Sequence, residues 1–303
     1  MTWSSPTRTS STSSAAASTV ALPPAGAAAD ATHAMAIAIR SCRMAMMIES
    51  MYRVYRQSAR AFPDFQRAPN QGDRPDLYEL ENRAIDPDGL VLAAMSKLAP
   101  WSGRTLVDLG CGAGFWLPGY AEQAKAVIGI EPDGELLPLA ASRGPRARVL
   151  PGSAEHLPLA DSGVDVVHAR FAYFWPPRCG AGLAEVLRVL KTGGSLVVVD
   201  NDQRNGSFAE LLRSAGYVAQ GQAETTDAWW AQRGANRVEV MSRWQFESRA
   251  DLESVLRMEF PGPAGASWLA DHPDALGLTY GYVLFAVRKS SGPPNNRPAR
   301  HRT

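Results

Sequence analysis

The amino-acid sequence predicts an α/β fold in which a mostly parallel sheet carries helices on both of its faces. Between about residues 104 and 214, short apolar runs alternate with helical patterns, and such alternating units form parallel sheets with a helix in each crossover. After about residue 238 the segments become longer, and apolar residues alternate with polar ones. This second pattern is typical of half-exposed antiparallel strands, so antiparallel pairing is expected near the carboxyl terminus.

Short apolar or alternating segments give the expected strands. They are residues 104–109, 126–130, 147–150, 164–168, 195–200, 238–246 and 278–288. The last is the longest, and it places Tyr280, Tyr282 and Leu284 at alternate positions. No internal repeat at a fixed period connects these segments.

Helical spacing of apolar residues gives the expected helices. They are residues 48–65, 86–98, 113–123, 133–143, 182–190, 208–214 and 250–258. The first is amphipathic and rich in Tyr and Arg, and the second ends before Pro100. The third is expected to be helical even though it contains Pro118.

The composition fits one domain flanked by low-complexity ends. The chain has 303 residues, of which 45% are hydrophobic, and that is ample for a packed core. Residues 1–46 are expected to be a disordered extension, because the small and polar residues of its first part bury too little apolar surface to offset the ordering entropy. Residues 290–303 are expected to be a disordered tail. Residues 47–289 then form the folded domain.

Charge, hydropathy and cysteine content argue against several classes of function. The net charge is +1 with scattered Lys and Arg, which disfavours a nucleic-acid partner. No apolar run approaches the roughly 20 residues that span a bilayer, so no membrane association is expected. The three cysteines, Cys42, Cys111 and Cys179, form no pair or Cys/His cluster typical of a metal site. A reducing, cytoplasmic location is therefore expected, and the oligomeric state is left open.

The motif richest in chemical information is Val-Asp-Leu-Gly-Cys-Gly-Ala-Gly at residues 107–114. It lies where an expected strand meets an expected helix, and its glycines allow a tight turn with a ligand against the main chain. About twenty residues later, Glu131 ends the next strand. A carboxylate there can accept hydrogen bonds from both hydroxyls of a ribose. Together these features indicate a ligand that contains adenosine.

The spacing of the glycines distinguishes two classes of adenosine ligand. Dinucleotide-binding proteins require Gly-x-Gly-x-x-Gly, which places a helix N-terminus against a pyrophosphate. Here Phe115 stands where the third glycine of that pattern belongs. An NAD-dependent oxidoreductase is therefore the less favoured alternative.

These motifs resemble those of a known family. Residues 106–114 are similar to the first motif of the class I S-adenosylmethionine-dependent methyltransferases, and Glu131 matches the ribose-binding acid of that family. Three further segments are similar in the family's order, namely the adenine-contacting segment, the approach to strand four and the turn into strand five, at residues 149–158, 161–167 and 187–196. The resemblance covers about residues 104–200 well and is greatest for the small-molecule, type 11 branch.

The resemblance implies a Rossmann-like, seven-stranded, mostly parallel sheet whose last strand is antiparallel, with S-adenosylmethionine as cofactor. It also implies that Asp108 receives the ammonium group of the cofactor, that Glu131 binds its ribose and that Ser153 and Ala154 form an adenine wall. The cofactor-binding residues so implied are Asp108, Gly110, Cys111, Gly112, Gly114, Glu131, Pro132, Ser153, Ala154, Glu155 and His168. Structural alternatives remain for several of them, because glycines also make ordinary turns and carboxylates also cap turns and helices.

The acceptor side departs from the family pattern. Ser153 stands where the family often has an Asp, and residues 168–177 lack the family's common Leu-His pair. They also lack the Asn-Pro-Pro-Tyr signature of amino-directed DNA methyltransferases. His168, at the expected end of the fourth strand, and Tyr173 are the candidates for a general base, although each is also consistent with a structural role.

The sequence thus predicts a methyltransferase that aligns a small-molecule acceptor for in-line displacement. The alternative from another class is a non-catalytic S-adenosylmethionine-binding protein that acts as a sensor or subunit. A set of aromatic residues is expected either to line a lid or acceptor pocket or, for most members, to fill the core. The set comprises Tyr52, Tyr55, Phe171, Phe174, Trp175, Trp229, Trp230 and Trp244. Neither the acceptor nor the methylated atom follows from the sequence.

Overall fold

The computed structural model describes residues 62–67, 70 and 73–290. All of them belong to one unit of the chain, Tyr55–Thr303. The predicted extension at 1–46, most of the predicted helix at 48–65 and the tail from residue 291 lie outside the described residues. The described end of that helix, residues 62–65, is a turn. Pro63 explains the correction, because a proline disfavours helical geometry at the residue before it.

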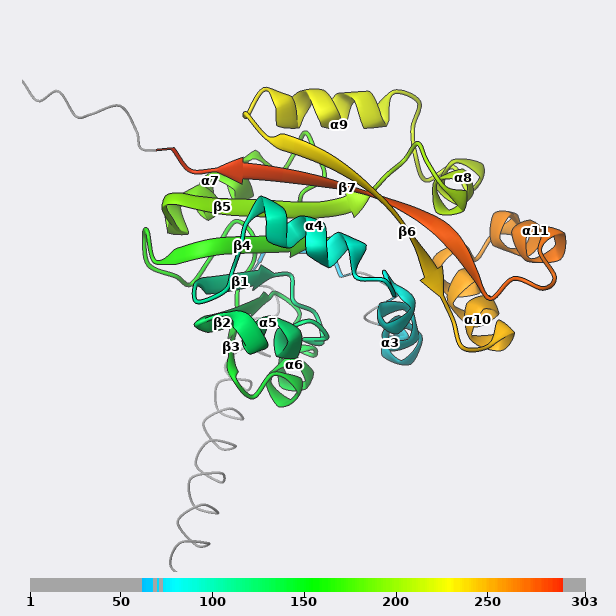
Figure 1. Cartoon of the computed structure of the whole chain (residues 1–303), viewed down its shortest axis with the longest axis horizontal. Helices are drawn as coiled ribbons and strands as arrows, with labels where there is room; N and C mark the ends of the chain where they lie inside the picture. The colour runs from blue at the N-terminus through cyan, green and yellow to red at the C-terminus, as the bar shows by residue number, and fades with distance from the viewer. Residues whose placement is uncertain (1–61, 68–69, 71–72, 291–303) are drawn as a thin grey trace, which may run out of the picture. The chain divides into compact units, whose positions relative to one another are not determined.

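Seven strands form one sheet in the order β3-β2-β1-β4-β5-β7-β6 (Figure 1). They are β1 (Thr105–Leu109), β2 (Ala126–Glu131), β3 (Ala147–Pro151), β4 (Val164–Arg170), β5 (Leu190–Asn201), β6 (Asn236–Gln245) and β7 (Gly277–Arg288). Neighbours among β1 to β5 pair in parallel, whereas β7 runs antiparallel to both β5 and β6. The predicted Rossmann-like sheet with an antiparallel last strand is confirmed.

Helices cover both faces of the sheet, because alternate strand residues enter two separate cores. The helices are α3 (Pro75–Ala84), α4 (Leu90–Leu98), α5 (Leu117–Gln123), α6 (Leu137–Arg143), α7 (Gly180–Val189), α8 (Ser207–Ser214), α9 (Gln222–Ala231), α10 (Arg249–Glu259) and α11 (Pro263–Asp271). One core joins Leu106 of β1 to residues of α4, α5, α8 and α10. The other joins the neighbouring Val107 to residues of α7 and α9. In Figure 1, α4 crosses in front of the sheet.

Three helices begin about four residues later than the sequence predicts. At the first, Asp86 adopts a left-handed conformation (φ 50°), and its carboxylate accepts hydrogen bonds from the backbone N–H groups of Leu90 and Val91 at 2.9 and 2.8 Å. Asp86 therefore caps α4 and does not belong to it. Before α5 and α6, residues 113–116 and 133–136 form turns.

The sequence prediction missed three helices and misplaced several strand ends; β5, for example, begins at Leu190 and not at residue 195. Pro75 and Pro263 stand at the start of α3 and α11, where proline is compatible with a helix. The apolar residues of α9 do not follow one face, so its periodicity is weak. Strand β4 continues two residues beyond the predicted 164–168 and ends at Arg170. His168 therefore lies inside the strand, not at its end.

The sheet topology fixes where a ligand belongs. Strand β1 lies between β2 and β4, because the chain passes from β1 to β2 and β3 on one side and then crosses from β3 to β4 on the other side. Ligands of open α/β sheets bind at the carboxyl ends of the strands beside such a point. The motif at 107–114, Glu131 and Arg170 all lie there.

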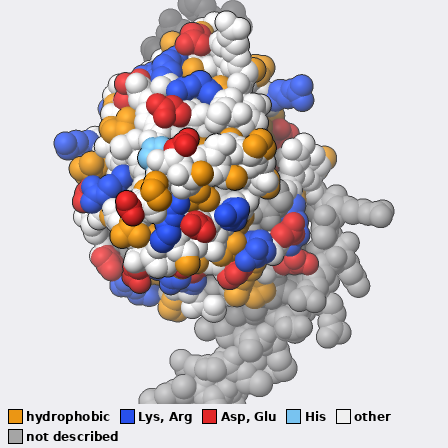
Figure 2. Space-filling model, turned by 90° about the vertical axis from the view of Figure 1, so that its right-hand side faces the viewer, with side chains coloured by type: hydrophobic (Ala, Val, Ile, Leu, Met, Phe, Trp, Pro, Cys, Tyr) orange, Lys and Arg blue, Asp and Glu red, His pale blue; other side chains and the backbone are white. Residues whose placement is uncertain are grey.

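The surface is mixed in charge on the side turned to the viewer in Figure 2, where acidic and basic side chains are interspersed with hydrophobic ones. Within the described ranges, the structure has no helix that is both long and apolar enough to cross a membrane. It also places no group of three or more His, Cys, Asp or Glu so as to hold a metal ion in that part of the chain.

Candidate functional site

The turn after β1 is built on three glycines with left-handed φ angles. Gly110, Gly112 and Gly114 have φ values of 74°, 56° and 79°, which favour glycine because a Cβ is strained there. A Cβ on Gly110 would lie 2.6 Å from the Cβ of Ala172, and one on Gly114 would lie 2.7 Å from the Cα of Ala140. The structural reason for glycine thus holds at both ends of the turn, whatever ligand the turn contacts.

Glu131 connects this turn to the end of β2. Its side chain is 5% exposed, and its two carboxylate oxygens accept hydrogen bonds from the backbone N–H groups of Gly112 at 2.7 Å and Asp133 at 2.8 Å. Burial raises the pKa of Glu131 to about 7, although these two bonds oppose the shift. A carboxylate has about four acceptor positions, so two remain for the hydroxyls of a ligand.

Asp108 is a buried carboxyl group without a hydrogen bond from any described residue. It is 3% exposed, near the end of β1, and it lines a pocket of about 590 Å³, part of which is open to solvent. Burial raises its pKa to about 7, and the charge of Arg170 opposes the shift. Because a buried carboxylate without donors is costly, this group is suited to a cationic ligand group.

The pocket brings the glycine turn together with Phe171, which the sequence analysis considered for an acceptor pocket, and with residues that it assigned to no site. Tyr78 and Asn82 of α3 form one side, Trp116 lies in the turn before α5, and Arg170 and Phe171 follow from β4. Arg170 places its guanidinium 3.6 Å from the centre of the Trp116 ring. The sequence did contain a signal for Arg170, because it is a charged residue at the end of a mostly apolar strand. No such signal was available for α3, because its helix was not predicted.

The predicted adenine wall forms a compact loop beyond β3. Ser153 and Ala154 are 2% and 4% exposed, and the backbone N–H of Ser153 donates to the carbonyl of His156 at 3.3 Å. Strand β3 pairs with β2 so that Pro151 faces Glu131. The loop therefore begins beside the ribose-binding candidate and its neighbour Pro132, although it does not line the pocket at Asp108.

Neither of the two candidate bases lines the pocket. The first of them is His168. It is fully buried, its ring packs edge-on against Trp101 and Tyr120 at centroid distances of 5.2 Å, and neither ring nitrogen has a hydrogen-bond partner among the described residues. Burial lowers the pKa of His168 to about 3, so the ring is neutral. Its contacts are those of a core residue.

Tyr173 is also held away from the pocket. Its hydroxyl donates to Glu155 at 2.5 Å and accepts from the backbone N–H of Gly182 at 3.1 Å. The ring lies so close to Gly182 that a Cβ there would be 2.2 Å from Cε1 of the tyrosine. Tyr173 and Glu155 thus form a link between two loops.

The remaining predicted residues separate into packing and surface positions. Among the aromatic residues, Phe174, Trp229, Trp230 and Trp244 are buried in the cores, Trp175 is 58% exposed and Phe171 lines the pocket. Tyr52 and Tyr55 lie outside the described residues. Cys111 is 8% exposed, and burial raises the pKa of its thiol well above the usual range. This disfavours thiolate chemistry in the turn.

Comparison with known proteins places this arrangement in context. Residues 107–198 match the family model described as a methyltransferase domain. An uncharacterized methyltransferase of Mycobacterium bovis is 36% identical over 142 residues, which cover 46% of this chain and 56% of the relative.

Two further relatives carry names that state an activity. The malonyl-acyl-carrier-protein O-methyltransferase of Pectobacterium atrosepticum is 32% identical over 113 residues, which cover 37% of this chain and 44% of the relative. The ubiquinone/menaquinone biosynthesis C-methyltransferase of Rubrivivax gelatinosus is 36% identical over 104 residues, which cover 34% and 41%. The chain thus matches about half the length of these curated relatives.

Proposed function

We propose that this chain is a class I S-adenosylmethionine-dependent methyltransferase that transfers a methyl group from S-adenosylmethionine to a small-molecule acceptor; the match of residues 107–198 to a methyltransferase domain and the similarity to known methyltransferases support this. The observation that supports the proposal best is the pairing of Asp108 with Glu131. These two buried carboxyl groups flank one glycine turn. One of them has no donor among the described residues, and the other is anchored to the turn.

The residues fit the cofactor that the family implies. The carboxylate of Asp108 faces the pocket and is complementary to an ammonium group. The carboxylate of Glu131 keeps free acceptor positions for ribose hydroxyls. The glycine turn brings bare backbone to the same place, and the loop at Ser153 would close the adenine end.

When bound, S-adenosylmethionine supplies an electrophilic methyl group on a sulfonium that is a good leaving group. The protein's contribution is then to hold the acceptor in line, and alignment of this kind supplies roughly 7–11 kcal/mol of a barrier. Since His168 and Tyr173 do not line the pocket, neither is proposed as a general base. The pocket walls at Tyr78, Trp116 and Phe171 are aromatic, which favours a small acceptor with apolar surface.

The acceptor atom is left open in this proposal. The names of the two relatives specify transfer to oxygen in one protein and to carbon in the other. Because the similarity is confined to the cofactor-binding part of the chain, the acceptor of a relative cannot be assigned to this protein.

Calorimetric titration of the full-length protein with S-adenosylmethionine, S-adenosylhomocysteine and NAD tests the proposal. We expect micromolar binding of the first two ligands and none of NAD. A set of nucleophilic small molecules is then incubated with methyl-labelled cofactor, and transfer of label is followed. Binding of NAD alone would contradict the proposal, and cofactor binding without transfer to any acceptor would favour the non-catalytic alternative.

A further inference from the structure

Arg170 is a charged residue two of whose donor atoms have no hydrogen-bond partner among the described residues. It ends β4, and its Nε and Nη1 atoms are buried without a hydrogen-bond partner in the described part of the chain. No acid of the described residues lies within ion-pair distance of it. Leaving a buried donor unsatisfied costs free energy, so a residue kept in this state calls for an explanation.

The surroundings of Arg170 hold the guanidinium in place without neutralising it. Its plane is stacked on Trp116 at 3.6 Å, which fixes its position at the pocket wall. Asp108 lines the same pocket and is influenced by the Arg170 charge, but the two groups form no ion pair. By contrast, Arg143, also on the pocket wall, is paired with Glu79 at 2.8 Å.

We infer that Arg170 is a carboxylate-binding residue of this pocket, with its stacked guanidinium donating to one carboxylate group of a bound molecule. The inference deepens the proposed function, on which it rests. A planar guanidinium matches a carboxylate in shape and charge. Because Arg143 is paired with Glu79, Arg170 is left as the one unpaired positive charge among the described residues of the pocket, and with Asp108 beside it this favours a monoanion over a doubly charged phosphate.

Two molecules can bring that carboxylate to the pocket. One is the cofactor, whose methionine end carries an ammonium group for Asp108 and a carboxylate for Arg170. The other is the acceptor, because Arg170 lines the same pocket as the aromatic walls at Trp116 and Phe171. The chemistry at Arg170 is the same in both cases, and the ligand differs.

The test uses the full-length protein, Arg170→Gln and Arg170→Lys, with Arg257→Gln as a surface control that removes the same charge from α10. Arg257 is 63% exposed in its side chain. Two comparisons are made by calorimetry. The first is S-adenosylmethionine against decarboxylated S-adenosylmethionine, and the second is benzoate binding to protein saturated with S-adenosylhomocysteine.

If the carboxylate belongs to the cofactor, wild type and Arg257→Gln prefer the intact cofactor by about 10–100-fold, and Arg170→Gln loses that preference. If it belongs to the acceptor, Arg170→Gln retains cofactor affinity and loses benzoate binding. Arg170→Lys, which keeps the charge without the planar donors, recovers part of the effect in either case and also tests whether loss of fold explains the Gln variant.

Equal weakening of both cofactor forms, with benzoate binding unchanged or absent in wild type, would overturn the inference and assign Arg170 to packing. The proposed function is judged separately, by whether wild type binds S-adenosylmethionine or S-adenosylhomocysteine at all. Benzoate binding to the ligand-free protein that depends on Arg170, without cofactor binding, would support the inference and contradict the proposed function.

Discussion

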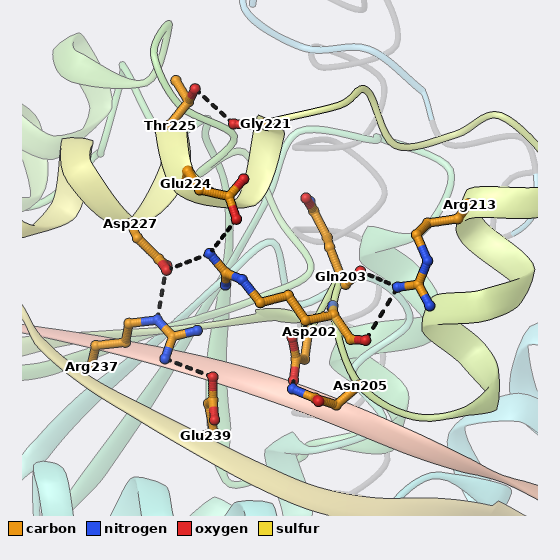
Figure 3. Close-up of polar contacts among 11 residues, drawn as sticks. Asp202, Gln203, Asn205, Arg213, Gly221, Glu224, Thr225, Asp227, Arg237 and Glu239 are labelled. Atoms are coloured by element: carbon orange, nitrogen blue, oxygen red, sulfur yellow. Dashed lines mark hydrogen bonds and ion pairs between the residues drawn. The ribbon is translucent and has the colours of Figure 1, made fainter.

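Two groups of charged residues beside the sheet differ in whether their members form ion pairs. Near α9 and β6, Arg204 and Arg237 both pair with Asp227, at 2.9 and 2.8 Å, and each has a second acid, Glu224 or Glu239. Figure 3 shows this network converging on Asp227. In the pocket at the end of β1, Asp108 and Arg170 face the same space and make no ion pair. The first group is paired within the fold, and the lack of such pairing in the second group supports the proposal that it binds a ligand.

The largest expected effect comes from removing the anchored carboxylate. Glu131→Ala should weaken binding of S-adenosylhomocysteine by roughly 100-fold, because two hydrogen bonds to a charged group contribute about 3 kcal/mol together. It also leaves the buried N–H groups of Gly112 and Asp133 without their acceptor. Calorimetry measures the affinity and urea unfolding measures the stability.

Glu131→Gln is the matched control, since the amide retains an acceptor oxygen for one backbone donor. Its affinity should lie between wild type and Glu131→Ala. If Glu131→Ala bound the ligand as tightly as wild type, the carboxylate would be a turn cap and not a ribose ligand.

An effect of comparable size should appear in the pH dependence of the stability of the ligand-free protein. Burial raises the pKa of Asp108 to about 7, above the usual value near 4. The folded state therefore holds this proton more tightly than the unfolded chain, and the stability present below about pH 4 is lost as the pH rises to about 7. Asp108→Asn should be more stable than wild type by up to about 4 kcal/mol at pH 8 and equal to it near pH 4. Urea unfolding at several pH values measures this.

Ionisation of Asp108 should also affect ligand binding, and here the affinity should rise with pH whereas the stability falls. Wild type should bind S-adenosylmethionine about fivefold more tightly at about pH 7.5 than at pH 6, because an ionised Asp108 favours the ammonium group, which keeps most of its protons up to about pH 7.5. Asp108→Asn should bind weakly and without this dependence. The Glu131 carboxyl also titrates near pH 7, so Glu131→Gln is the control that isolates the Asp108 part. A pH dependence preserved in Asp108→Asn would contradict the assignment.

The paired network should behave as a structural element. Asp227→Ala should lower the free energy of unfolding by about 1 kcal/mol, because its two ion pairs are partly exposed. Binding of S-adenosylhomocysteine should not change. A loss of affinity comparable to that of Glu131→Ala would mean that the network belongs to the binding site.

The smallest effect is expected at His168. His168→Leu should change S-adenosylhomocysteine affinity and methyl transfer by less than about threefold, since a volume-conserving change at a buried neutral ring is usually tolerated. A general base would instead contribute on the order of 10²–10⁴-fold. A rate loss in that range, with unchanged affinity and unfolding midpoint, would restore the catalytic role considered from the sequence. Phe174→Leu, another core change, is the control.

The sequence by itself determined the class of fold, the position of the glycine turn and the acid at the end of β2. These features follow from local patterns, because strand periodicity, glycine spacing and an acid twenty residues later are all read within short segments. The antiparallel pairing of β7 with β5 and β6 was expected, but the expected half exposure was wrong, because β7 lies between two strands and its residues 280–285 are all buried. The starts of α4, α5 and α6 were placed too early, because capping side chains and turns resemble the first turn of a helix in sequence.

The tertiary structure alone decided which charges have partners. Asp108 and Arg170 are 62 positions apart in the sequence and line one pocket because β1 and β4 are neighbours. His168, two residues before Arg170, is enclosed by Trp101 and Tyr120 from elements distant in the chain. Burial and pairing depend on contacts between such distant segments, and those contacts separate the residue suited to a ligand from the one that fills the core.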